Sequence, residues 1–427
     1  EVYGERVSEY MGTGAGDPRT RRIKAGIMLA GLATFTLLYN TQAILPDLTR
    51  DYGITPSAAA MSVSIATAGV GLGLLVAVPI SERIGRGRLI RWSVIVAGVM
   101  AAGVVFISDW NLFLVARFVM GFILAGLPAT ATVYLREEIH PSIVSSVIGV
   151  HIFGNTLGGL GARIIPSTTI EVFDWLGIEG ILGLDKSHSA MFTASLVGLL
   201  AGLACFFLLP PAQGFVQHRD SFSVLVKKFG RAFTDPVLLG LFVVGYLGVG
   251  SFIGALNVMG FRLEGDPYFI PIGLIGLIYF VYPLAGWASA IAGKIADRTS
   301  LRAVMSFGPL IGLVGVALMM IPNVVCIVAG LAILAIGFFT GHSIAASWVA
   351  GRASRSVGVP AQAASIYMVC FYLGSSVTGN LTPLAWTHAG WGGVTAIIGS
   401  QMALLLILAL ILKRTPVAPA DTRTVQK

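Results

Sequence analysis

The chain has 427 residues, of which 56% are hydrophobic and 11% are charged, and its mean hydropathy is +0.85. Soluble domains carry about 25% charged residues, so this composition excludes an ordinary soluble protein, a disordered chain and a disulfide-rich scaffold. The formal net charge of +8 therefore describes which side of a membrane the basic residues occupy, and we expect no nucleic-acid partner. Cys205, Cys326 and Cys370 lie in apolar runs without paired spacing, which favours buried packing residues over a metal site or a disulfide.

Apolar segments of about 20 residues, the length that crosses a bilayer, recur along the chain. Their continuous apolar faces, glycine-rich interiors and scattered prolines predict transmembrane helices, because a membrane barrel would show short alternating segments instead. We expect an all-α membrane fold with twelve transmembrane helices. They span approximately 23–45, 58–80, 89–107, 112–134, 143–166, 190–210, 236–258, 272–293, 303–321, 324–350, 362–386 and 393–412.

The Lys and Arg residues predict the orientation of these spans. An even number of spans places both termini on one side of the membrane. Of the 28 basic residues, Arg50, Arg117, Arg163, Lys186 and Arg262 fall on the other side, which leaves 23 on the side of the termini. Cytoplasmic loops carry the excess of basic residues, so we expect a multi-pass protein of the inner membrane with both termini in the cytoplasm.

The longest predicted cytoplasmic connection, 211–235, divides the chain into six plus six spans. It contains SFSVLVKKFGRAF, in which apolar and basic residues alternate at helical spacing. This pattern favours an interfacial amphipathic helix, with a plain linker as the alternative. The longest predicted external loop is 167–189, which is mildly acidic. The expected domains are a tail (1–22), a six-helix bundle (23–210), the linker (211–235), a second six-helix bundle (236–412) and a tail (413–427).

A short loop motif repeats in the two halves. ERIGRGR follows the second span and GKIADRTSLR follows the eighth, each with an acid-arginine pair. Internal repeats of six helices are typical of one class of membrane transporter. The loop resembles the helix 2–3 signature of the major facilitator superfamily, although Val78 replaces the expected Gly and Glu82 the expected Asp. The resemblance implies that these loops gate alternating access. The implied gating residues are Glu82, Arg83, Gly85, Arg86, Asp297 and Arg298.

Two further motifs strengthen the resemblance, which covers about 25–412. RFVMG, from Arg117 to Gly121, resembles the Arg-x-x-x-Gly motif of proton-coupled drug antiporters. GNTLGG in helix 5 is similar to the antiporter Gly-Pro-x-x-Gly-Gly motif, with Asn155 in place of Pro. This Asn, together with stretches of the second half, resembles the arabinose-efflux-permease-like branch of the family. The helix-5 motif consists of Gly154, Asn155, Gly158, Gly159 and Arg163.

The candidate cavity follows from the fold that the resemblance implies, in which helices 1, 4, 7 and 10 line a central path. The polar and aromatic residues of these helices suit a small amphipathic or polyhydroxyl solute. A charged residue within a span is a functional candidate by default, while interfacial snorkelling is the alternative for Arg117. The expected cavity residues are Thr36, Tyr39, Asn40, Arg117, Tyr246 and His342.

All twenty acidic residues fall in loops or at span ends, so no carboxylate is expected near the bilayer midplane. Proton coupling would therefore pass through other groups, and a neutral or anionic solute is favoured over a drug cation. The candidates for proton coupling are Asp47, Arg117, His151 and His342.

These features predict a monomeric secondary transporter that exports a small solute, sugar-like or amphipathic, in exchange for protons. The alternatives are an uncoupled facilitator or importer and, from another class, a lipid-handling protein or enzyme. The sequence contains no HExxH motif, P-loop or nucleotide fingerprint, so we expect no catalytic residues, no metal and no cofactor.

Overall fold

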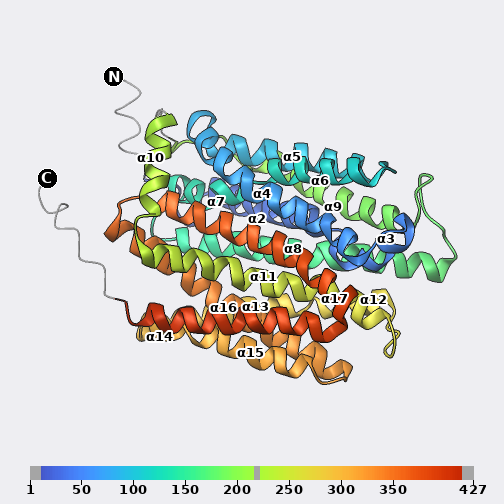
Figure 1. Ribbon diagram of the computed structural model, residues 1–427. Coiled ribbons are helices and arrows are strands. Elements are labelled where there is room, and N and C mark those ends of the chain that lie inside the picture. The colour runs from blue at the N-terminus through green and yellow to red at the C-terminus, as the bar shows by residue number, and fades with distance from the viewer. Residues whose placement is uncertain (1–10, 216–221, 416–427) are drawn as a thin grey trace, which may run out of the picture. The chain divides into compact units, whose positions relative to one another are not determined.

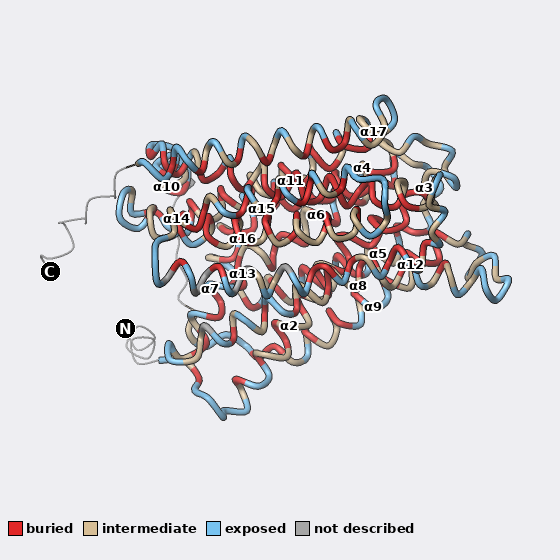
Figure 2. The backbone as a smooth tube through the Cα atoms, turned by 90° about the horizontal axis from the view of Figure 1, so that it is seen from below, coloured by how far each residue is buried: buried red, intermediate tan, exposed pale blue. Residues whose placement is uncertain are grey.

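The computed structural model describes residues 11–215 and 222–415. The chain separates into two compact units, and the main division between them, at 219/220, falls inside the predicted linker. The first unit contains 1–54, 61–219 and 270–279, and the second contains 55–60, 220–269 and 280–427. Figures 1 and 2 show that both units are built from long helices, and no strand occurs in the described ranges.

The helices of the first half begin and end at recognisable signals. Asp17 caps the first long helix by accepting a hydrogen bond from Arg19 N, and Pro18 occupies its first position. Glycines in the left-handed region, including Gly53 and Gly177, end two of the others. The helices are α2 (Pro18–Tyr39), η1 (Gln42–Ile44), α3 (Leu45–Tyr52), α4 (Pro56–Ile84), α5 (Arg86–Val104), α6 (Trp110–Leu124), α7 (Gly126–Glu138), α8 (Val144–Leu176) and α9 (Lys186–Leu208).

The second half follows the same rules, with Asp235 and Asn323 as caps. Its last helix contains Gly390, whose backbone leaves the helical region, so one continuous assignment holds the two predicted spans 362–386 and 393–412. The helices are α10 (Phe222–Ala232), α11 (Pro236–Glu264), α12 (Ile272–Ile278), α13 (Val281–Arg298), α14 (Leu301–Met305), α15 (Phe307–Met319), α16 (Val324–Ser356) and α17 (Pro360–Lys413).

Nine helices of the described residues are long and apolar enough to cross a membrane. The remaining predicted spans correspond to α8, which is a further long helix, to α12 and α13, whose residues cover the predicted span 272–293, and to α17, which contains two spans. Large apolar side chains remain exposed along these helices, among them Val115 (59%) and Phe207 (72%). Such exposure suits contact with lipid, where a soluble protein would bury these side chains.

The expected external loop 167–189 is shorter in the structure, because α8 continues to Leu176. The prediction was wrong here because polar residues interrupt the apolar pattern. The hydroxyls of Ser167, Thr168 and Thr169 donate to carbonyls three or four residues earlier, so these side chains are satisfied within the helix.

The helices α2 and α8 pack closely against each other in the first unit. A Cβ atom at Gly154 would lie 2.2 Å from the carbonyl oxygen of Met28, and one at Gly158 would lie 2.5 Å from that of Leu32. At Gly31 it would lie 2.3 Å from Asn155 Oδ1. The glycines of the helix-5 motif therefore allow backbone-to-backbone approach, as small residues do between membrane helices.

We predict that Gly154→Val destabilises the first unit, because the added side chain meets backbone that cannot move aside. Overpacking of this kind costs about 1–3 kcal/mol. Thermal unfolding of the purified protein in detergent should show a lower midpoint. Gly149→Val is the matched control, because a Cβ at Gly149 of the same helix meets nothing within 4 Å. Equal midpoints for both variants would contradict the close packing.

Candidate functional site

The first long helix breaks at Asn40 and Thr41, and Arg117 supplies partners for the carbonyls at the break. The last carbonyls of a helix lack partners within it and form the negative end of its dipole. Arg117, on α6 and only 1% exposed, donates to Leu37 O at 3.1 Å and Leu38 O at 2.7 Å. Its Nε donates to Ser62 O at 3.0 Å. One guanidinium therefore joins α2, α4 and α6.

Asn40 extends this network across the break. Its Oδ1 accepts from Arg117 at 2.9 Å, and its Nδ2 donates to Ser195 Oγ of α9 at 3.1 Å. Thr41 accepts from Ser62 Oγ at 3.0 Å. All five side chains are buried. Because buried polar groups cost stability unless they are paired, this network favours one geometry of the broken helix.

Arg163 of α8 supports the same segment from another direction. Its side chain is fully buried and donates to Gly159 O and to Gln42 Oε1. The guanidinium lies 4.8 Å from the ring centre of Tyr39 and 5.3 Å from that of Tyr279, both within the range of cation–π attraction. The two arginines that the sequence leaves inside the spans thus both hold residues 37–42.

The predicted cavity residues divide into two groups in this structure. Thr36, Tyr39, Asn40 and Arg117 are packed inside the first unit, each at most 4% exposed, and Thr36 donates to Gly158 O. Tyr246 and His342 are half-buried in the second unit. Their role as cavity lining stays a prediction.

His342 is the titratable member of the second group. Its Nδ1 lies 2.8 Å from the hydroxyl of Tyr367, a residue that the sequence did not single out. The imidazole stacks on Phe338 at 5.7 Å and contacts Phe371 at 4.8 Å between ring centres. It also borders a small cavity of about 10 Å³ between α11, α15, α16 and α17, which is near the minimum for one water molecule.

The other proton-coupling candidates are placed differently. His151 is 7% exposed, and its Nε2 lies 3.3 Å from Asn155 Nδ2 in the α2–α8 contact. Within the described residues, Asn155 Oδ1 has no hydrogen-bond partner, whereas His151 has a backbone hydrogen bond with Ile27. Asp47 forms an ion pair with Arg50 at 2.6 Å.

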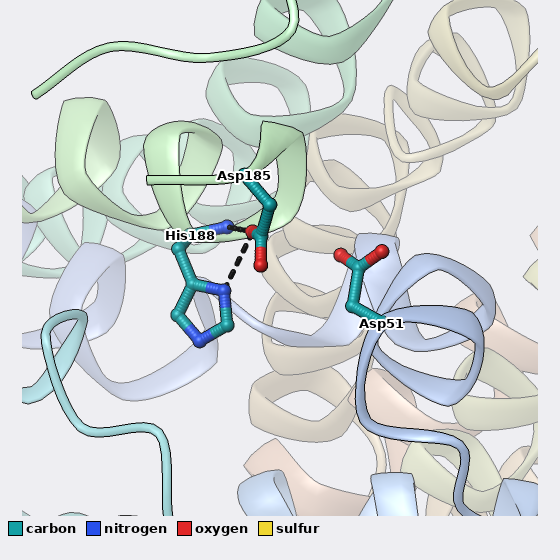
Figure 3. A group of neighbouring side chains, drawn as sticks. All are labelled: Asp51, Asp185 and His188. Atoms are coloured by element: carbon teal, nitrogen blue, oxygen red, sulfur yellow. Dashed lines mark hydrogen bonds and ion pairs between the residues drawn. The ribbon is translucent and has the colours of Figure 1, made fainter. Parts of the chain in front are cut away.

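A group of polar side chains ties the loop before α9 to the end of α3, and the sequence did not point to it. His188 Nδ1 lies 2.6 Å from Asp185 Oδ1, and its Nε2 lies 2.6 Å from the hydroxyl of Tyr52. That hydroxyl donates to Ile107 O at 2.9 Å. Figure 3 shows the Asp51 carboxylate facing Asp185 and His188. One carboxylate oxygen of each acid and a ring nitrogen of His188 all lie within 4.8 Å of one another. Because both ring nitrogens of His188 already have partners, the group acts as a connection between three segments.

The first gating loop contacts α7. Gly85 has φ +95°, and Arg86 forms an ion pair with Glu137. The adjacent Glu138 is fully buried and accepts from Arg19 at 2.6 Å. Glu82 is half-buried and Arg83 is exposed. The carboxylates of α7 therefore connect this helix to the gating loop at Arg86 and to the beginning of α2 at Arg19.

Glu138 also holds the first residues of the linker. Its Oε1 accepts from the backbone N–H groups of Gln213 and Gly214, both at 2.8 Å. Arg19 donates to Pro211 O at 2.5 Å. A buried carboxylate with this many charge-assisted bonds is well satisfied, so the start of the linker has a fixed attachment in the first unit.

In the second unit the equivalent ion pair has the opposite arrangement of charge. Asp235, which caps α11, binds Arg352 near the end of α16 at 2.7 Å. Burial raises the pKa of Asp235, but hydrogen bonds from Arg352, Ser356 and Val237 N lower it below its usual range overall. Arg298 of the second gating motif is exposed, and the side chain of Asp297 lies outside the described residues.

Comparison with known families and structures assigns the fold. The family model of the Major Facilitator Superfamily matches residues 27–379. The chain belongs to the major facilitator superfamily. Such proteins carry small-molecule solutes across membranes, so this protein is a membrane transporter and not an enzyme.

Two relatives named as transporters match this chain over nearly its whole length. The chain is 34% identical to the inner membrane transport protein YnfM of Escherichia coli strain K12, over 93% of this chain and 90% of that one. It is 32% identical to the MFS-type transporter YybF of Bacillus subtilis strain 168, over 95% and 96%.

Solved structures share the fold at low identity. An inward-facing, unoccupied bacterial homologue of the human lysosomal transporter Spinster has a TM-score of 0.73 and 12% identity, covering 93% of this chain and 96% of that chain. A mutant form of the nucleoside transporter NupG has a TM-score of 0.70 and 14% identity, covering 91% and 99%.

We predict that Arg117→Lys and Arg117→Ala both destabilise the folded protein. Lysine lacks the planar set of five donors that reaches several carbonyls, and each buried acceptor left unsatisfied costs about 1–3 kcal/mol. The unfolding midpoint of the purified protein should fall for both variants. Arg88→Ala, at an exposed arginine of α5, is the control and should leave the midpoint unchanged. A lysine variant as stable as the parent would refute the proposed role of the guanidinium.

We predict that the attachment of α9 weakens in acid. Burial raises the pKa of Asp185, but hydrogen bonds from the His188 side chain and backbone outweigh it and lower the pKa overall. A carboxyl with a lowered folded-state pKa stabilises the protein above its unfolded pKa of about 3.9 and loses that contribution as the pH falls through the folded value.

Asp185→Asn isolates this charge, because Asn is an equally good helix cap. The variant should lose part of the decrease in unfolding midpoint that the parent shows below about pH 4. Glu179→Gln in the same loop, with a side chain 94% exposed, should keep the parent's profile. Identical acid profiles for all three proteins would show that Asp185 contributes nothing there.

Proposed function

We propose that this transporter exports a small neutral or anionic organic solute, sugar-like or amphipathic, in exchange for protons. The export would proceed by alternating access, with the gating loops around Glu82–Arg86 and Asp297–Arg298 changing partners between states. We propose the inner membrane as its location, with both termini in the cytoplasm, and a monomer as the working form.

The observation that carries the proton-coupling proposal is the environment of His342. A proton carrier in a span needs a titratable group, a hydrogen-bonded neighbour and access to water. His342 has the Tyr367 hydroxyl at 2.8 Å and borders the small cavity of about 10 Å³ between α11, α15, α16 and α17. Arg117 is instead occupied by backbone carbonyls, and Asp47 by Arg50. We therefore assign the transported proton to His342, with Tyr367 as the residue that positions its ring.

The proposed solute class follows from the same accounting of charges. Arg117 and Arg163 both bind groups of their own unit, and the spans carry no carboxylate near their centres. A solute would thus meet hydroxyl, amide and aromatic groups, which suit a neutral molecule. An anionic solute would require one arginine to exchange its partners. A cation finds no carboxylate near the centre of the spans, which argues against a cationic drug as the solute.

We predict that His342→Gln uncouples transport from the proton gradient. The experiment uses proteoliposomes, with a labelled pentose, a labelled hexose and an amphipathic organic anion as probes. An imposed pH gradient should increase flux of at least one probe several-fold in the parent. In the variant, flux down the solute's own gradient should remain while the response to pH disappears. Tyr367→Phe should retain the response but shift its pH dependence, because the imidazole loses its hydrogen bond.

His388→Gln is the control, because His388 is exposed near the kink of α17. It should leave coupling intact. A full response to the gradient in His342→Gln would remove His342 as the carrier. Flux in the parent that ignores the gradient would instead support an uncoupled facilitator or importer. Absence of solute flux together with turnover of a lipid would support a lipid-handling protein.

A further inference from the structure

The short helix α10 lies across the long helices of its own unit. Figure 1 shows α10 running crosswise to α11 and α17, next to the ends where these two helices begin, and Figure 2 shows it at the same end. It contacts α17, and Arg231 Nη2 lies 3.7 Å from where a Cβ at Gly358 would be. Because α11 and α17 cross the membrane, a helix laid across their ends runs parallel to the membrane surface.

The side chains of α10 separate into three faces at about 100° per residue. Leu225 (5% exposed) and Ala232 (0%) share the face that packs against the protein. Val226 (53% exposed) lies on a neighbouring face. Phe233 (51%), in the turn directly after α10, is half exposed on the same side and also packs edge-on against Phe242 of α11, at 6.0 Å between ring centres. A soluble helix would bury such residues, so this second face suits an apolar medium.

The third face is basic. Lys227 and Arg231 are four residues apart, and both are exposed. Around the helix, the uncovered apolar face lies between this basic face and the face that packs against the protein. Val224 is the apolar exception on this side. An uncovered apolar face beside a basic face is the arrangement of helices that bind at the boundary between headgroups and acyl chains. Anionic headgroups complement these charges, and each basic residue near such a surface strengthens binding about fivefold.

We propose that α10 is a binding site for anionic phospholipid, with Val226 and Phe233 inserted at the acyl boundary and Lys227 and Arg231 at the headgroup phosphates. Only a short connection separates the end of the helix from Asp235, whose carboxylate binds Arg352. A few residues of chain therefore connect the lipid-binding helix α10 to the ion pair between Asp235, at the beginning of α11, and Arg352, near the end of α16. This site is independent of the solute and of the proton carrier.

The test is hydrogen–deuterium exchange of the full-length protein in nanodiscs. One set contains phosphatidylcholine alone, and the other an equal mixture of phosphatidylcholine and phosphatidylglycerol. Exchange of the backbone amides of 222–233 should be slower in the mixture, and exchange of α11 should be the same in both. In the double variant Lys227→Gln with Arg231→Gln, the difference between the two lipids should fall about tenfold or more.

The matched control is Lys413→Gln with Arg414→Gln, which removes the same charge from exposed residues at the end of α17. It should keep the parent's difference. Unchanged exchange of α11 in every variant confirms that the fold is retained. Equal exchange of 222–233 in both lipids, or an equal loss of the difference in the control, would overturn the proposal. Slower exchange in the mixture that survives Lys227→Gln with Arg231→Gln would also overturn it, because the two charges would then not explain the preference for anionic lipid.

Discussion

The break in the first transmembrane helix is the constraint on which the first unit depends. Interrupting a helix inside a membrane exposes carbonyl groups that neither water nor lipid can satisfy, and each costs several kcal/mol. Here Arg117 meets the carbonyls of Leu37 and Leu38, while Arg163 holds Gln42 and the ring of Tyr39. A buried arginine needs hydrogen-bond acceptors, and a broken helix has carbonyl groups without donors. Their hydrogen bonds therefore offset the free-energy cost of burying both groups.

The positions of α6 and α8 follow from this exchange. Gly154 and Gly158 let α8 approach α2 closely enough for Arg163 to reach the break. The network of Asn40 then connects the same segment to α9. A change in any of these contacts would have to rearrange the others, which favours movement of this unit as a whole over bending within it.

The two ends of the linker are attached in a similar way. Glu138, at the end of the fourth span, holds the linker's first residues, and Arg352, near the end of the tenth, holds Asp235 at its last. Both halves thus have an ion pair between the beginning of their first span and the end of their fourth span. The acid lies on the fourth span in the first half and before the first span in the second half. In the sequence, the charges at the span ends were used only to predict orientation. In the structure, they also attach the two ends of the linker to the spans.

The helical spans could be predicted from the sequence, because span length is a direct consequence of the thickness of the bilayer. The orientation that the Lys and Arg residues indicate stays a prediction. Close helix contact at the glycine motif of helix 5 could also be predicted, since its spacing places small residues on one face. The partners of Arg117 were not, because they are backbone carbonyls and carry no signature in the sequence. Tyr52, Ile107 and His188 come from distant segments that only the fold brings together, and Tyr367 resembled any packing aromatic of a span.

A structure of the protein in lipid, resolved with and without bound solute, would test the central claim most directly through the distance from the Arg117 guanidinium to the carbonyl oxygens of residues 37 and 38. We predict that both stay near the present 3.1 and 2.7 Å in the two states. A guanidinium that leaves these carbonyls to contact the solute would contradict the account.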